Sequence, residues 1–162
     1  MIPLFIGLTL VNLLGLATAG ALGYAANRGY GVGPWHVLAG AMAAIVCVAV
    51  HCVVFTYFAA TAKWVQHAIQ VKRLDPTLAG QTRSFKAHAF PAAIVAMAAT
   101  FAAAVLGAGA DNYRGSWPVW HHAAAVGAFV VNVVVAGVEY RAIARNGRLI
   151  DGILERVAAA GT

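Results

Sequence analysis

Four long apolar stretches constrain the fold of this 162-residue chain more than any other feature. They cover residues 2–26, 35–62, 87–110 and 118–140. A helix rises about 1.5 Å per residue, so about 20 apolar residues cross the ~30 Å hydrocarbon core of a bilayer. Each stretch reaches that length, and little sequence remains for a soluble domain. We therefore expect residues 1–162 to form a single all-α membrane domain, an integral four-helix bundle.

The composition agrees with this expectation. Hydrophobic residues make up 62% of the chain and charged residues only 10%, against about 25% charged residues in a soluble domain. Residues Ala17, Thr18 and Ala19 resemble a signal-peptide cleavage site, but no Lys or Arg precedes the first apolar stretch. We expect that stretch to be kept as the first helix.

Basic residues predict the orientation in the membrane. Only Arg28 and Arg114 lie in the first and third connections. The other nine lie between the second and third stretches or after the fourth: Lys63, Lys72, Arg73, Arg83, Lys86, Arg141, Arg145, Arg148 and Arg156. Cytoplasmic loops carry the excess of Lys and Arg, so both termini are expected in the cytoplasm, with the chain in the inner membrane. The net charge of +6 needs no nucleic acid to explain it.

The connections predict the topology. Those at 28–34 and 111–117 are short, which favours antiparallel neighbours and an up-down-up-down bundle. Asp75 and Pro76 form a helix start, and Asn146 with Gly147 suggests a break. We expect helices at about 2–26, 35–73, 76–110 and 118–145, then an amphipathic tail at 148–159 on the inner membrane surface or against a partner. No internal repeat is evident.

Polar residues inside the apolar stretches are the candidate functional groups. Five are histidines: His36, His51, His88, His121 and His122. On a helical wheel of the fourth stretch, His121, Asn132 and Glu139 share one face with several alanines. Polar groups within a membrane normally face the bundle interior, where the simplest role is to join packed helices.

Metal coordination is a second way to keep an imidazole inside a membrane, and haem iron is a common partner. Four apolar helices that together hold five histidines resemble the small four-helix b-type cytochromes and the haem-carrying membrane anchors of respiratory enzymes. This resemblance implies haem b held by histidines from different helices, with electrons exchanged with a quinol or a partner redox centre. The chain would act alone or as the cytochrome b subunit of an oxidoreductase complex.

The histidines fall into three tiers of depth. His36 lies within about one helical turn of His121 and His122, so this outer tier can share one ligand. The wheel favours His121, with His122 as its substitute. His51 lies roughly 20 Å deeper than His36, at the level of Asn12 and Asn132, which are its candidate hydrogen-bond partners.

His88 lies near the inner edge, beside Lys63 and Glu139. An ion pair between Lys63 and Glu139 is the plainest expectation there. Together with Asn132, they are also candidates for a proton or quinone site.

Two alternatives stay open. The outer trio His36, His121 and His122, with Asp111 nearby, can instead bind copper or zinc. The chain can also be a non-haem accessory subunit whose polar stripes dock onto larger membrane subunits or a second copy. No Walker loop, Rossmann glycine pattern, serine elbow or CxxC pair is present, so soluble-enzyme chemistry is not supported.

Overall fold

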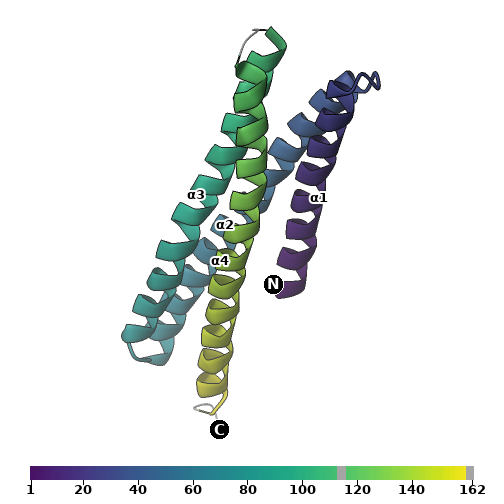
Figure 1. Cartoon of the computed structure of the whole chain (residues 1–162). Coiled ribbons are helices and arrows are strands. Elements are labelled where there is room, and N and C mark those ends of the chain that lie inside the picture. Colours follow the sequence, from purple (N-terminus) through teal and green to yellow (C-terminus); the bar gives the residue numbers. More distant parts are fainter. Residues whose placement is uncertain (113–115, 160–162) are drawn as a thin grey trace.

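The computed structural model describes residues 1–112 and 116–159, and this part of the chain forms four long helices (Figure 1). They are α1 (Ile2–Asn27), α2 (Gly33–Lys72), α3 (Thr77–Asn112) and α4 (Trp117–Ala159). Each is long and apolar enough to cross a membrane. The prediction of an all-helical, four-helix fold is confirmed.

The helices run up and down, and each one packs beside its neighbour in the chain (Figure 1). α4 also packs against α1, which closes the ring. The backbones of the diagonal helices α2 and α4 come close at few points, and no close backbone approach joins the described residues of α1 and α3. Because α1 is the shortest helix, it covers only part of the bundle's length. The end with the α2–α3 turn is built by three helices.

The turns have local causes. In the α1–α2 connection, Gly29 and Gly31 have φ angles of 83° and 70°, values that glycine tolerates best. Arg73 ends α2 in a left-handed conformation, with φ of 51°. A carboxylate oxygen of Asp75 accepts the backbone N–H of Thr77 at 2.8 Å. This is the capping role expected of Asp75, although α3 begins at Thr77 rather than at Pro76.

Helix α4 corrects one expectation. It continues through Asn146 and Gly147 to Ala159, so the predicted break and separate surface tail are wrong. Asn146 is fully buried, and its amide donates to the Tyr57 hydroxyl at 3.1 Å and the Thr61 hydroxyl at 3.0 Å. These contacts with α2 outweigh the local preference of an Asn-Gly pair for a turn. Further along, Ile153 packs in the bundle.

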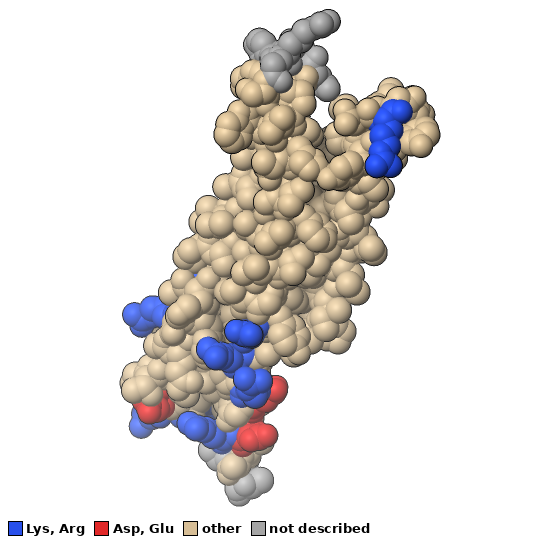
Figure 2. Space-filling view, viewed as in Figure 1, with Lys and Arg blue, Asp and Glu red and all other residues tan. Residues whose placement is uncertain are grey.

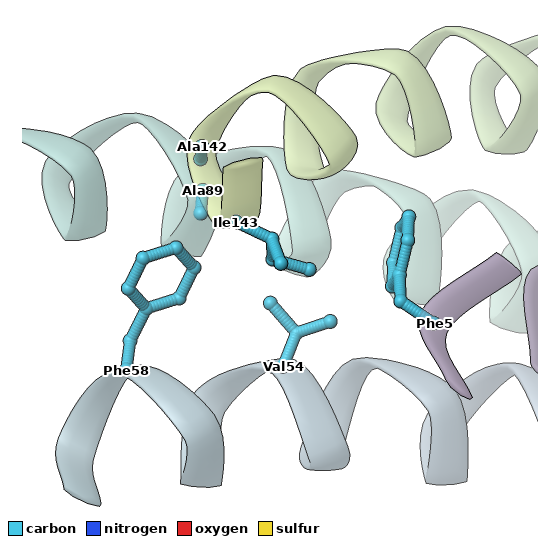
Figure 3. Packing of buried hydrophobic residues seen from close by; sticks show 6 residues of the cluster. All are labelled: Phe5, Val54, Phe58, Ala89, Ala142 and Ile143. Carbon is cyan, nitrogen blue, oxygen red and sulfur yellow. The ribbon is translucent and has the colours of Figure 1, made fainter. Parts of the chain in front are cut away.

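The main apolar cluster joins all four helices (Figure 3). Its members are Phe5 of α1, Val54 and Phe58 of α2, Ala89 of α3, and Ala142 and Ile143 of α4. A second cluster of Val65, Leu78 and Ile153 lies nearer the α2–α3 turn. Both clusters lie toward the end opposite His36 and His121, so that the histidine end is held together by other contacts.

Much of the apolar surface faces outward. Leu14, Phe101 and Val119 are 65%, 70% and 68% exposed. Figure 2 shows a broad band without Lys, Arg, Asp or Glu, and most charged residues gather toward the end with the α2–α3 turn and the C-terminus, whereas Arg28 ends α1 at the opposite end. Exposed apolar surface of this extent is unfavourable in water and suits contact with lipid.

Candidate functional site

Two histidines at the end with the α1–α2 connection hold matching positions in the two helical hairpins. Nδ1 of His36, on α2, lies 2.9 Å from the carbonyl oxygen of Ala19 on α1. Nδ1 of His121, on α4, lies 3.0 Å from the carbonyl oxygen of Ala103 on α3. A carbonyl only accepts, so Nδ1 carries the proton in both rings. In a neutral imidazole the lone pair is then on Nε2.

A glycine lies under each ring. A Cβ atom added to Gly23 would be 2.9 Å from Cε1 of His36, and one added to Gly107 would be 2.9 Å from Cε1 of His121. Any larger residue would collide with the imidazole. Each glycine follows the alanine whose carbonyl accepts the Nδ1–H by four residues, one helical turn, so ring and backbone meet in the same way in both hairpins.

The two hairpins therefore repeat the same histidine–glycine arrangement at this end, which the sequence analysis did not identify. The sequence signal is faint: Ala19 with Gly23 and Ala103 with Gly107, then a Trp-His pair ending at His36 or His121. The glycine-to-histidine spacing differs by one residue between the hairpins, which hides the repeat from a simple alignment. Sequence reasoning did not connect either glycine with a histidine ring.

The two rings meet edge to face across the bundle. Their centroids are 5.9 Å apart and their planes are inclined by 62°. They come from α2 and α4, the diagonal helices, and no described residue makes a hydrogen bond to Nε2 of either ring. The structure thus brings together the outer pair expected from helix depth.

His122 does not join this pair. Its Nε2 atom lies 3.0 Å from the Tyr24 hydroxyl, and the two rings meet edge to face at 5.1 Å. This exposed contact joins α4 to α1. Within residues 1–112 and 116–159, no three His, Cys, Asp or Glu side chains form a group that could hold a metal ion. The side chain of Asp111, expected beside the trio, and Arg114 lie outside the described residues.

A buried pair occupies the middle of the bundle. Nδ1 of His51 lies 2.8 Å from Oε1 of Glu139, and the side chains are only 3% and 1% exposed. His51 was expected to bond Asn12 or Asn132, and Glu139 was expected to pair with Lys63. Neither pairing forms: Lys63 is exposed, and the described residues include no ion pair between it and Glu139. The side chains of His51 and Glu139 reach each other from the diagonal helices α2 and α4, and this contact forms in place of the expected pairings.

The asparagines bond to each other instead. Asn12 donates to Asn132 at 2.9 Å, and Asn132 donates to the Thr100 hydroxyl at 3.0 Å. The Cys47 thiol lies 3.5 Å from oxygens of both Thr100 and Asn132. This network draws one side chain from each helix and was not predicted beyond Asn12 and Asn132. Both cysteines are free, with Cys47 buried and Cys52 exposed.

Three buried polar atoms near this network have no protein partner in the described chain: Thr9 Oγ1, Asn12 Oδ1 and His51 Nε2. Gly15 of α1 lies against Ala43 of α2, and Phe5 lies in the same cluster as Val54. That antiparallel register puts Thr9 close to the level of His51. Buried polar groups are normally hydrogen-bonded, so these three atoms can bond a buried water. Nε2 of His51 can also bind a proton.

His88 lies apart from the other histidines. It is exposed, and its Nδ1 lies 2.8 Å from the carbonyl oxygen of Ser84, one turn back in α3. Its bond is local to its own helix. Of the five candidate histidines, the structure therefore pairs His36 with His121, pairs His51 with Glu139, and places His88 and His122 outside these pairs.

Comparisons with protein-family models, curated proteins and solved structures found no match to this chain. Its function is therefore argued from the geometry of its own residues.

Proposed function

We propose that the chain is a multi-pass membrane protein that binds haem b between its two hairpins, with His36 and His121 as axial ligands, and transfers electrons. The observation that carries the proposal is the facing histidine pair. The ring centroids of His36 and His121 are 5.9 Å apart, and these two imidazoles would hold the haem iron, which supplies a one-electron couple when bound.

The residues around the rings also fit the group. Ligating histidines normally donate their second ring N–H to a carbonyl or carboxylate, which fixes the tautomer and makes the ligand more basic. Here the carbonyls of Ala19 and Ala103 accept the Nδ1–H groups of His36 and His121. Gly23 and Gly107 let each ring lie against a helix backbone.

Haem, when bound, supplies a one-electron couple, and the protein sets its potential through ligation, burial and hydrogen bonding. His36 and His121 would supply the ligation. Because the pair lies near one end of the bundle, electrons would be exchanged with a quinol or a partner redox centre at that end. The partner would be another membrane subunit or a second copy of the chain.

The distribution of charge supports an orientation. Lys and Arg gather toward the end with the α2–α3 turn and the C-terminus (Figure 2), and cytoplasmic ends carry this excess. Both termini would then face the cytoplasm from the inner membrane, with His36 and His121 near the opposite face. The buried pair of His51 and Glu139 would lie between the two faces, as a group able to hold a proton within the bundle, with Asn132 close by.

A copper or zinc site at the outer end has less support. Zinc in proteins generally has three or four protein ligands, whereas the described residues contain no such group. Two facing imidazoles with free Nε2 atoms suit an iron whose other four ligands come from a porphyrin.

An absorption spectrum tests the proposal. The chain, expressed with haem available and purified in mild detergent, should give reduced-minus-oxidised Soret and α bands. His36→Ala and His121→Ala should each lose this signal, while His88→Ala, which removes a histidine outside the pair, should keep it. A flat visible spectrum, or full haem content in both outer variants, would overturn the assignment.

A further inference from the structure

A hollow between α3 and α4 lies at the charged end of the bundle, far from the histidine pair. Its volume is ≈ 380 Å³, and three arginines of α4 line it: Arg145, Arg148 and Arg156. Phe85 of α3 and Ile153 of α4 contribute apolar wall. A cationic rim beside an apolar wall suits a ligand with an anionic part and an apolar part.

The arginines differ in how far their charge is already balanced. Asp75 is hydrogen-bonded by Thr77, which lowers the pKa of its carboxyl, and the nearby Arg156 lowers that pKa further. Arg156 therefore has an acidic neighbour. Neither Arg145 nor Arg148 forms an ion pair within the described residues. These two guanidinium groups are left to bind an external anion.

Gly152 opens the hollow between the arginines. It lines the hollow, and a Cβ atom added to it would meet nothing within 4 Å. Arg148, Gly152 and Arg156 are spaced by four residues, so they lie along one face of α4. The stretch of helix backbone at Gly152, between Arg148 and Arg156, is therefore open to the hollow.

We infer that this hollow binds the phosphate of an anionic phospholipid, with Arg145 and Arg148 as its ligands and the apolar wall against the rest of the lipid. A guanidinium group bonds phosphate through two parallel N–H donors. Basic pockets between transmembrane helices on the cytoplasmic side bind such headgroups. The inference needs the membrane placement proposed above but not the haem, so the two fail separately.

The position along α4 favours a lipid over free phosphate. Arg141 is the first basic residue after the apolar part of α4, and Arg145 follows it by one helical turn. The hollow therefore begins where headgroups would lie, about 6 Å beyond Arg141 at the helical rise. Free phosphate would gain nothing from an apolar wall, whereas the glycerol and upper acyl carbons of a lipid would.

The experiment uses the full-length protein in mild detergent and measures binding of phosphatidylglycerol and phosphatidylcholine by native mass spectrometry. Phosphatidylglycerol should bind one molecule per chain more tightly than phosphatidylcholine. Arg145→Gln and Arg148→Gln should each weaken it about fivefold or more, the scale of a lost charge-assisted hydrogen bond. Arg141→Gln removes the same charge from an exposed residue outside the hollow and should change binding less than about twofold.

A second pair of variants separates a shaped site from general attraction to charge. Gly152→Leu fills the hollow without changing any charge and should weaken phosphatidylglycerol binding as much as Arg148→Gln. Gly147→Leu is the matched control, because its added Cβ also meets nothing within 4 Å while Gly147 does not line the hollow. Circular dichroism of each variant verifies that the helices are intact.

Two results would overturn the inference. If Arg141→Gln weakens binding as much as Arg148→Gln and Gly152→Leu has no effect, the attraction is diffuse and there is no site. If inorganic phosphate displaces the lipid at a concentration equal to that of the lipid, the apolar wall contributes nothing and the ligand is a free anion.

Discussion

Nδ1 of His51 and Oε1 of Glu139 lie 2.8 Å apart in the interior, where each side chain is almost fully buried. They come from α2 and α4, diagonal helices whose backbones come close at few points. His36 and His121 join the same two helices at the end with the α1–α2 connection. Both contacts tie one hairpin to the other, as do the bonds of Asn146 to Tyr57 and Thr61. When Nε2 of His51 is protonated and one further proton is shared between Nδ1 and Oε1, the His51–Glu139 pair is neutral overall whichever atom holds the shared proton, which lets it stay buried.

Removing one member of this pair should lower the stability of the protein more than removing both members. Glu139→Leu leaves the imidazole of His51 without its partner, and loss of one member of a buried pair costs about 3–5 kcal/mol. The melting temperature in detergent should fall clearly. The double variant His51→Leu with Glu139→Leu removes both polar groups and should regain most of the loss.

A double-mutant cycle tests that prediction by measuring the interaction free energy between His51 and Glu139. Strong coupling between the two positions is expected, whereas simple additivity would show that the pair does not act as a unit. His88→Leu serves as a control, because that histidine is exposed and bonds only within its own helix, and should leave the melting temperature nearly unchanged.

The glycine beneath His36 should be as important as the histidine. Gly23→Ala places a Cβ atom 2.9 Å from Cε1 of the ring, so the imidazole must move and its bond to the Ala19 carbonyl must lengthen. We expect haem content per chain to fall severalfold and the α band to shift. Difference spectra of the purified variant measure both.

The matched control is Gly20→Ala, one turn away in the same helix. A Cβ atom there meets nothing within 4 Å, and alanine favours a helix by about 1 kcal/mol over glycine. Haem content should stay at the wild-type level in this variant. An equal loss in both variants would mean that Gly23 matters only for helix α1 and not for the ring.

The number of helices and their order could be predicted because they follow from lengths and loops. Four apolar stretches and short connections leave few alternatives. The break at Asn146 and Gly147 was predicted wrongly because local turn preference is weak. The burial of Asn146 against Tyr57 and Thr61 is a tertiary effect that no local pattern reveals.

The site was predictable only where depth alone decides it. Counting residues from the helix starts places His36 and His121 at one level, and the structure pairs them. The partner of His51 could not be obtained in this way. Glu139 reaches it through a long side chain from the diagonal helix, whereas Asn132, at the expected level, is held by Thr100 and Asn12. Which residue bonds to His51 depends on how all four helices pack.

The continuity of α4 can be tested by hydrogen exchange. Asn146→Ala removes the donor to the Tyr57 and Thr61 hydroxyls and leaves both acceptors without it, a loss of about 1–3 kcal/mol. Amides of residues 148–157 should be protected in the wild-type protein and exchange faster in this variant. If they exchange freely in the wild type, a separate surface tail would be the better description.

The helix start at Asp75 predicts a response to acid. Hydrogen bonds from Thr77, followed by the charge of Arg156, lower the pKa of the Asp75 carboxyl from its ordinary value of 3.8. A lowered folded-state pKa means stabilisation that is fully present above 3.8 and lost as the pH falls through the lower, folded value. Asp75→Ala should therefore melt at a lower temperature than the wild type at pH 6, and the difference should shrink below pH 3.8.

Because the carboxyl is fully exposed, added salt should reduce the part of the difference that comes from Arg156 but not the part that comes from the Thr77 hydrogen bond. A difference that stays constant from pH 6 to pH 3 would show that the carboxylate charge has no role in starting α3.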